Sequence, residues 1–194
     1  MMKTKVCSYS FQIILFLLII VASLWLSIEA APCKPSGKLR GKRPPHHSQC
    51  NQENNSECCR EGEHYTTFEC SPPVTHRTKA ILTLTSFEKG GDGGGAAACD
   101  FRFHNDNTPI VALSTGWFNH KKRCLQNITI FGNGRKVNAM VVDECDSTIG
   151  CDADHDFQPP CPNNVVVASK AVWKALCVPE SNWGLLDIHW SDAY

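Results

Sequence analysis

The number and spacing of its cysteines constrain the fold of this chain more than any other feature of its sequence. The 194 residues include 12 cysteines, and only Cys7 precedes residue 31. Structural zinc sites need Cys-x2-Cys or His-x3-5-His pairs, and neither spacing occurs after residue 30. We therefore expect no metal site and no cofactor, and we predict a disulfide framework instead. Ten cysteines are assigned to it, with their pairing left open: Cys33, Cys50, Cys58, Cys59, Cys70, Cys99, Cys124, Cys145, Cys151 and Cys161.

Two details of this framework follow from the sequence. Cys58 and Cys59 are adjacent, so they should bond to different partners. The odd total leaves one thiol unpaired, and Cys177 is the best candidate because it sits at the end of a predicted helix. We expect Cys177 to behave as a small buried hydrophobic residue.

The first thirty residues have the layout of a secretory signal peptide. Lys3 and Lys5 precede an apolar block, residues 11–26, and small residues follow at Ala30 and Ala31. A signal anchor is the alternative, because the block approaches the length that spans a bilayer. We favour cleavage near Ala31. Residues 1–30 are thus predicted to be a signal peptide, and the protein to be secreted, extracellular and free of membrane after cleavage.

Charge is balanced overall but unevenly distributed along the chain. Removing residues 1–30 takes away two of 19 basic residues and one of 19 acidic ones, which leaves 17 against 18. No net charge recruits nucleic acid or an anionic membrane, so we expect neither partner. Basic residues gather between Lys34 and Arg43, whereas acidic residues crowd the stretch 143–156.

Residues 31–64 are predicted to form a basic N-terminal arm held in place by cysteines. Residues 32–49 contain almost no large apolar side chain, so they cannot bury enough surface to fold alone. Residues 65–194 are expected to form one barrel domain, because a mature chain of this length suits a single core.

Hydrophobic periodicity within the barrel domain predicts mainly β structure. Asn133-Gly134 is typical of a hairpin turn, because both central positions need a positive φ. Ser169 is expected to cap a short helix, which Val178-Pro179 ends. The predicted strands are 65–70, 80–85, 109–114 with a continuation through 115–118, 127–131, 136–142, and a last one in which Leu186, Ile188 and Trp190 face inward.

Candidate chemistry is concentrated in residues 137–151, an apolar strand that ends in a carboxylate-rich loop. Asp143 and Glu144 invite comparison with glycosidases, which use two carboxylates. Adjacent residues on a strand point to opposite faces, however, so both cannot line one groove without a bend. Asp143 is therefore only a weak catalytic candidate, and we expect the protein not to be an enzyme. The loop is instead predicted to be a binding surface formed by Asp143, Asp146, Asp152 and Asp154.

Spacing excludes two familiar ligand-binding loops. The glycine-rich run 90–95 is not followed by Gly-Lys-Ser/Thr, so we interpret it as a flexible or tightly turned surface loop. The acidic run that starts at Asp152 resembles the opening of a calcium loop. Its sixth position is Phe157 and its twelfth is Asn163, which excludes an EF-hand. Weak calcium binding by an irregular loop is left open.

Two further kinds of candidate site are present. Trp117 and Phe118 are a candidate recognition platform, with burial in the core as the alternative. Asn54 and Asn127 each begin a glycosylation sequon. The alternation of residues 127–131 leaves Asn127 on the solvent side.

Six segments of the chain resemble plant kiwellins: Cys-Lys-Pro-Ser-Gly at 33–37, Cys-Ser-Pro-Pro-Val-Thr at 70–75, Phe-Glu-Lys-Gly-Gly-Asp-Gly-Gly at 87–94, Val-Ala-Leu-Ser-Thr-Gly-Trp-Phe at 111–118, Met-Val-Val-Asp-Glu-Cys-Asp-Ser at 140–147 and Ser-Lys-Ala-Val-Trp-Lys-Ala-Leu at 169–176. The resemblance implies a secreted, cysteine-rich ripening-related or defence protein. It implies a six-stranded double-psi β-barrel, as in barwin and expansins, with one or two short helices and a disulfide-tied N-terminal arm. Kiwellins commonly have glycine where this chain has Cys177.

The resemblance also sets the functional expectation. Some kiwellins bind and inhibit secreted enzymes of fungal pathogens, so we expect a non-enzymatic defence protein of the apoplast or cell wall. Its expected partner is a protein such as a secreted fungal enzyme, bound by the Trp117 region and the acidic loop. The alternative is a barwin-like or expansin-like protein that binds cell-wall carbohydrate, with weak or no hydrolase activity at Asp143.

Overall fold

The computed structural model describes residues 32–44, 46 and 50–193. The predicted signal peptide, residues 1–30, lies outside the described residues. The stretch Cys33–Tyr194 forms one compact unit. Within the described part of the chain, no helix has the length and apolar character needed to cross a membrane.

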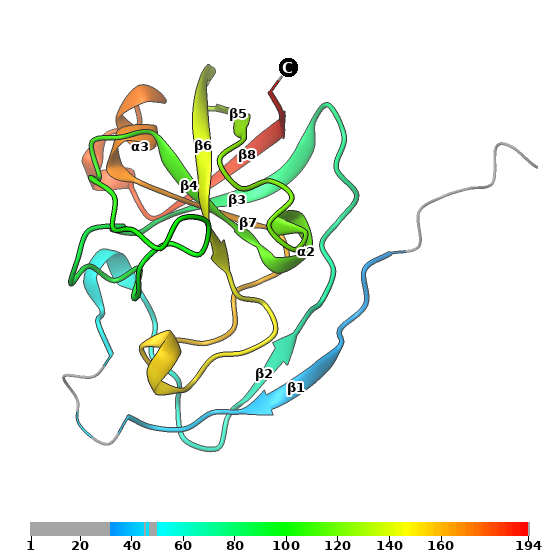
Figure 1. The fold of residues 1–194 in the computed structure, drawn as a ribbon, viewed down its shortest axis with the longest axis vertical. Coiled ribbons are helices and arrows are strands. Elements are labelled where there is room, and N and C mark those ends of the chain that lie inside the picture. The colour runs from blue at the N-terminus through cyan, green and yellow to red at the C-terminus, as the bar shows by residue number, and fades with distance from the viewer. Residues whose placement is uncertain (1–31, 45, 47–49, 194) are drawn as a thin grey trace, which may run out of the picture. The chain divides into compact units, whose positions relative to one another are not determined.

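Six strands close into a barrel, which confirms the predicted mainly β fold class (Figure 1). Two neighbouring pairs are parallel, β3 with β7 and β4 with β6, and the other neighbours are antiparallel. Parallel neighbours need crossover connections, so the chain cannot form this barrel as a simple meander. In order around the barrel the strands are β3 (Thr78–Leu84), β7 (Val165–Ala168), β4 (Ile110–Ser114), β6 (Arg135–Cys145), β5 (Asn127–Gly132) and β8 (Leu185–Asp192).

Side chains that point into the barrel form its core. Ile128 and Ile130 on β5, and Ile188 and Trp190 on β8, are almost fully buried, as their alternation predicted. The Trp190 ring meets the ring of Trp117 edge-on, with their centroids 5.1 Å apart. Such an aromatic pair contributes about 0.5–1.5 kcal/mol beyond the burial of its area.

The hairpin between β5 and β6 turns at Asn133-Gly134, as predicted. Asn133 and Gly134 have φ values of 49° and 69°, the left-handed conformations that this two-residue turn requires. The Asn133 side-chain amide donates hydrogen bonds to the carbonyl oxygens of Leu176 and Cys177, each at 3.0 Å. The turn is thereby joined to the segment that follows the helix α3 (Lys170–Ala175).

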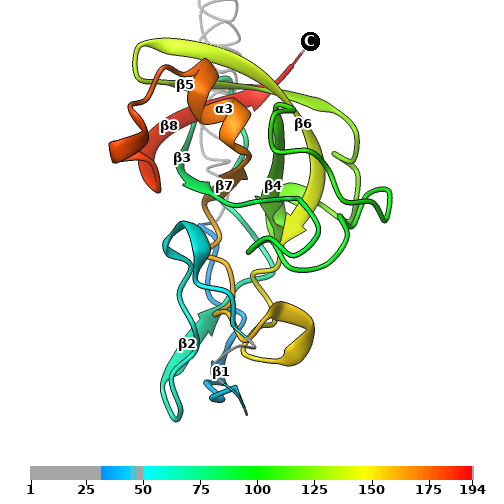
Figure 2. The same ribbon diagram turned by 90° about the vertical axis from the view of Figure 1, so that its left-hand side faces the viewer.

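Two strands lie outside the barrel. β1 (Gly37–Arg40) and β2 (His64–Thr67) pair as a separate antiparallel sheet. The predicted strand 65–70 therefore ends at Thr67 and belongs to this small sheet. Figure 2 shows the sheet on the same side of the barrel as the loop that follows β6.

Two helical expectations were wrong in detail. Residues 115–118 do not continue β4 but form a short helix, α2 (Thr115–Phe118). A Cβ atom at Gly116 would lie 2.1 Å from the Ser71 nitrogen, so only glycine allows this close approach. Ser169 occupies the N-cap position of α3, as predicted, but its side chain makes no capping hydrogen bond, because its hydroxyl donates to the Thr108 carbonyl at 2.7 Å. The described residues also form three short 3-10 helices: η2 (Glu53–Asn55), η3 (Ala153–His155) and η4 (Glu180–Asn182).

All ten cysteines assigned to the disulfide framework are bonded, and Cys58 and Cys59 have different partners. Among the described cysteines, Cys177 is the free thiol, as predicted, but it is exposed rather than buried. It follows the end of α3 with a φ of 53°, which turns its side chain out of the core. The five bridges are Cys33–Cys70, Cys50–Cys58, Cys59–Cys151, Cys99–Cys124 and Cys145–Cys161.

Candidate functional site

An acidic cavity of about 340 Å³ opens beside the C-terminal end of β6. Its walls come from that strand end, the glycine-rich loop and the loop of residues 146–160, with Ala112 of β4 and Val167 of β7. Among the described residues that line it there is no lysine or arginine, and His155 is the one histidine. Six acidic residues contribute to the lining: Asp92, Asp143, Glu144, Asp146, Asp154 and Asp156.

A bulge in β6 precedes two adjacent acidic residues that line this cavity. Val111 pairs with Val141, but the next residue of β4, Ala112, pairs with Asp143, so one residue of β6 is skipped. A bulge of this kind bends the strand and re-aims the side chains after it. Asp143 and Glu144 follow the bulge in regular register, opposite Ala112 and Leu113. Both nevertheless line the cavity, which lies at the end of the strand, and this corrects the expectation that they could not share one groove.

Asp143 is held by backbone groups and carries a perturbed carboxyl. The N–H groups of Ala98 and Glu144 each donate to its Oδ1 atom at 2.8 Å. Burial raises the pKa of Asp143 above its usual range because it disfavours the charged form, and these two hydrogen bonds offset only part of the effect. The negative charge of Glu144 adds to the rise. Asp143 thus anchors the loop around Ala98 while lining the cavity.

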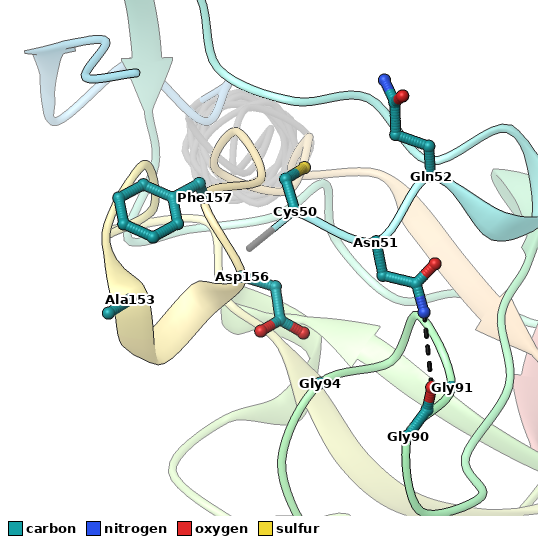
Figure 3. Close-up of a pocket in the computed structure, with 9 residues that line it drawn as sticks. All are labelled: Cys50, Asn51, Gln52, Gly90, Gly91, Gly94, Ala153, Asp156 and Phe157. Atoms are coloured by element: carbon teal, nitrogen blue, oxygen red, sulfur yellow. Dashed lines mark hydrogen bonds between the residues drawn. The ribbon is translucent and has the colours of Figure 1, made fainter. Parts of the chain in front are cut away.

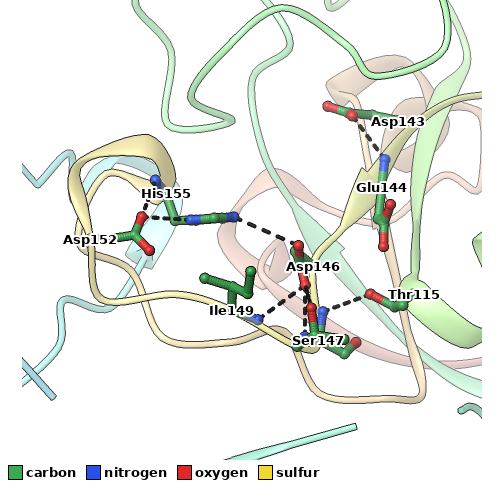
Figure 4. A network of polar contacts seen from close by, with 9 residues as sticks. Thr115, Asp143, Glu144, Asp146, Ser147, Ile149, Asp152 and His155 are labelled. Atoms are coloured by element: carbon green, nitrogen blue, oxygen red, sulfur yellow. Dashed lines mark hydrogen bonds and ion pairs between the residues drawn. The ribbon is translucent and has the colours of Figure 1, made fainter. Parts of the chain in front are cut away.

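A second set of carboxylates is organised around His155 (Figure 4). His155 Nδ1 lies 2.6 Å from Asp152 Oδ1, and its Nε2 lies 3.7 Å from Asp146 Oδ2. Burial alone would raise the pKa of Asp152, but the hydrogen bonds and charge of His155 outweigh it and lower that pKa. Asp146 Oδ1 accepts hydrogen bonds from the N–H groups of Thr148 at 2.7 Å and Ile149 at 3.1 Å.

Disulfides and backbone hydrogen bonds brace the loop of residues 146–160. Cys145–Cys161 closes its base, and Cys59–Cys151 joins it to the N-terminal arm. The Cys161 N–H donates to the Asp146 carbonyl at 2.7 Å. Asp146 and the rest of this wall therefore hold a fixed arrangement.

Sequence similarity to known proteins extends over nearly the whole chain. A sequence model described as Kiwellin-1 matches residues 22–193. The chain belongs to the kiwellin family. Ripening-related protein 3 of Oryza sativa subsp. japonica is 49% identical over 170 residues, which cover 86% of this chain and 78% of that protein. Kiwellin of Actinidia chinensis var. chinensis is 49% identical over 168 residues, which cover 86% of this chain and 70% of that protein. These matches confirm the resemblance carried by the six motifs.

Solved structures resemble this kiwellin more distantly. An expansin of Clavibacter michiganensis has 18% sequence identity and a TM-score of 0.46, over 61% of this chain and 50% of the expansin. We draw no functional argument from that likeness.

Three of the four predicted acidic binding residues line the cavity of this kiwellin, and one does not. Asp143, Asp146 and Asp154 contribute to its walls. Asp152 lies outside the lining and acts instead through His155, which it positions.

The predicted aromatic platform is wrong. Trp117 and Phe118 are each 1% exposed, and the Trp117 indole N–H donates to the Pro72 carbonyl at 2.7 Å. The short helix α2 turns both rings into the core, so neither can contact a partner. Exposed large apolar side chains include Phe101 at 77% and Leu125 at 50%, on loops joined by Cys99–Cys124. Phe101 lies in a highly polar segment of the sequence, and this was the signal that could have marked it as an exposed aromatic residue.

The glycine-rich loop is organised around a buried carboxylate. Asp92 is 2% exposed, and its carboxylate accepts hydrogen bonds from the Ser86 N–H at 2.8 Å, the Asn54 amide at 2.9 Å and the Ser56 hydroxyl at 2.8 Å. The loop is therefore the tightly turned form of the two that the sequence allowed. A second cavity of about 650 Å³ lies between it and the residues around Asn51, and it shares Asp156 with the first (Figure 3).

The two sequons occupy different environments. Asn127 is exposed at the start of β5. The Asn54 amide donates to Asp92 inside the arm's contact with the glycine-rich loop. Glycan attachment at either residue stays a prediction, and the folded structure favours Asn127.

Metal binding finds no support within the described residues. They contain no group of three or more His, Cys, Asp and Glu side chains placed to hold a metal ion.

Proposed function

We propose that this kiwellin is a secreted, non-enzymatic defence protein that binds, and thereby inhibits, secreted proteins of pathogens. One observation carries the proposal: the braced cavity is lined by six acidic residues and by no lysine or arginine. Such a surface complements a lysine or arginine side chain of a protein partner. Five disulfides fit a chain made for the extracellular space, the apoplast or cell wall.

The rigidity of the acidic wall supports recognition of a protein. Asp146 and His155 are fixed by hydrogen bonds within a loop closed by Cys145–Cys161. A site that is already ordered loses little conformational entropy on binding, and arginine pairs with carboxylates through two parallel hydrogen bonds. Electrostatic complementarity of this kind gives fast association and partner selectivity.

Exposed apolar side chains near the cavity supply the second part of the proposed interface. Ala98 lines the cavity, and Phe101 is exposed on the same loop. The Phe101 N–H donates to the Ala97 carbonyl at 2.8 Å. The Lys121 ammonium lies 4.9 Å from the centroid of the Phe101 ring. Aromatic anchors beside a polar region are typical hot spots of protein interfaces.

A purified partner tests this proposal. The chain is used to capture proteins from a fungal secretome, and the affinity of the captured protein is measured by calorimetry together with inhibition of its activity. Asp154→Asn combined with Asp156→Asn should weaken binding about tenfold or more, since hydrogen bonds to charged groups contribute about 1.5–3 kcal/mol. The matched control, Glu57→Gln with Glu180→Gln, removes the same charge at exposed sites elsewhere. Equal loss of binding in both variants would show that the cavity is not the site.

Carbohydrate binding with weak or no hydrolysis is the second candidate function, and the raised pKa of Asp143 favours it. A carboxyl whose pKa is raised by burial in a cavity has the property required of a general acid. Cell-wall glycan binding and release of reducing sugar are compared for the wild type and Asp143→Asn. Hydrolysis by the wild type that disappears in the variant would overturn the non-enzymatic proposal, whereas equal inertness would support it.

A further inference from the structure

A basic groove lies at the opposite end of β6 from the acidic cavity. It has a volume of about 720 Å³ and runs beside the β5–β6 hairpin and β8, where Arg77, Phe131, Arg135, Lys136 and His189 line it. We propose that this groove binds an acidic polysaccharide of the polyuronide class, in which each sugar ring carries a carboxylate. The inference is independent of the proposed protein-binding function, because it rests on another surface.

Strand register places cationic and aromatic side chains in one row across four strands. Lys79 of β3 pairs with His189 of β8, His189 with Phe131 of β5, and Phe131 with Lys136 of β6. Paired residues on adjacent strands share a face, and strands lie about 4.8 Å apart, so the row spans about 14 Å. The inward neighbour of Phe131 is the fully buried Ile130, which sets the row on the outside of the barrel.

Phe131 gives the row a surface on which a sugar ring can pack. Its side chain is 38% exposed although it lies on a barrel strand. The apolar C–H face of a pyranose ring can cover it, which removes apolar surface of both groups from water. Lys136 on one side, and His189 and Lys79 beyond it on the other, are placed to meet charged groups at the edges of the ring.

The neighbouring row of outward-facing residues, two positions along each strand, offers hydrogen bonds instead of charge. Ser191 of β8 pairs with Thr129 of β5, and Thr129 with Asn138 of β6. The Thr129 hydroxyl donates to Asn138 Oδ1 at 2.9 Å. Residues two apart on a strand are separated by about 6.6 Å, so this row is within one sugar ring of the first. A hydroxyl-rich polymer with carboxylates uses both rows, whereas an acidic peptide uses mainly the first.

The positive charge of the groove is not neutralised locally. In the described part of the chain, Arg77, Lys79, Arg135 and Lys136 form no ion pair. Asp187 is the one acidic residue in the lining. The acidic cavity is remote, because the eleven residues of β6 separate Arg135 from Cys145 by about 33 Å.

Calorimetric titration with polygalacturonate oligomers tests the inference. The probe is the de-esterified oligomer, and its fully methyl-esterified form of the same length is the neutral comparison. We expect the acidic form to bind, with an affinity that falls as salt is raised, and the ester to bind at least about tenfold more weakly. Equal affinity for the two forms would overturn the proposal.

Two variants locate the binding. Arg135→Gln with Lys136→Gln should lower the affinity about tenfold. The control, Lys38→Gln with Lys42→Gln, removes the same charge from the exposed N-terminal arm and should leave it unchanged. Phe131→Ala, which alters no charge, should also weaken binding, and thermal unfolding verifies that each variant is folded. Equal loss in the control variant, or polyglutamate binding as tightly as polygalacturonate, would contradict a polyuronide site.

Discussion

Asp143 is the residue of the acidic cavity whose protonation is linked to the stability of the fold. Burial raises its pKa, and the N–H groups of Ala98 and Glu144 offset only part of that rise. The folded protein therefore holds the Asp143 proton more tightly than the unfolded chain does. The stability linked to this proton is fully present below the ordinary carboxyl pKa of 3.8 and is lost as the pH rises through the raised pKa.

Replacing Asp143 with asparagine should remove this loss. The side-chain oxygen of the new amide can still accept both N–H groups, and the amide carries no charge to desolvate. Asp143→Asn should thus be more stable than the wild type at neutral pH, and the difference should shrink as the pH falls to 3.8 and below. Urea unfolding at a series of pH values measures this.

Asp152→Asn is the matched comparison, with the opposite sign. The pKa of Asp152 is lowered in the folded state, so its contribution to stability is present above pH 3.8 and is lost as the pH falls through the lowered pKa. This variant should be less stable than the wild type at neutral pH. If both variants shift the free energy of unfolding in the same direction, the opposite pKa shifts assigned to Asp143 and Asp152 are wrong.

Cys177 occupies a backbone conformation that suits glycine. Its φ of 53° lies in the left-handed region, one residue after the cap of α3, where helices commonly end in glycine. We expect Cys177→Gly to be more stable than Cys177→Ala by about 0.5–1 kcal/mol, because alanine retains the strain and both remove the thiol. Equal unfolding midpoints for the two variants would contradict this.

At the scale of elements, the bridge between the arm and the loop of residues 146–160 is the main long-range tie. Cys59–Cys151 joins residues 92 apart in sequence. Its removal by a double serine substitution should lower the free energy of unfolding by about 2–4 kcal/mol. Hydrogen exchange should accelerate first in residues 146–158, which lose their tie to the arm. The remaining bridge, Cys145–Cys161, still closes the base of the loop and confines the loosening to it. Uniform acceleration across the barrel strands would argue against a local role.

Elements with a strong local signal were predictable from sequence, and elements set by distant contacts were not. The Asn133-Gly134 hairpin and the alternation of β8 follow from turn chemistry and period. β7 is only four residues long and buried on most of its length, so it shows no alternation. The helix α2 depends on the approach of Gly116 to Ser71, a contact between segments remote in sequence.

At the scale of the whole molecule, a nearly neutral chain separates its charges along β6. Carboxylates gather at the end of that strand, and cations gather at its start. The acidic cavity could be anticipated because Asp143, Asp146 and Asp154 are close in sequence. The basic groove could not, since Arg77, Arg135 and His189 come together only when the barrel closes.

The end of β6 and a buried aromatic residue account for the remaining errors about the site. A regular strand separates the side chains of Asp143 and Glu144, yet both line one cavity because it lies where β6 ends and passes into the loop of residues 146–160. Trp117 is an aromatic residue of the kind that is common at binding sites, yet its indole lies against Trp190 inside the barrel. Neither outcome has a signature in the local sequence.

Hydrogen exchange of the chain with and without a captured protein partner tests the central claim most directly. If the acidic cavity is the recognition site, protection on binding should concentrate in residues 93–101 and 146–158, which form its walls and the adjoining Phe101 surface. Protection confined to the hairpin at 127–136, or no protection in the acidic loop of a complex shown to be intact, would contradict the account.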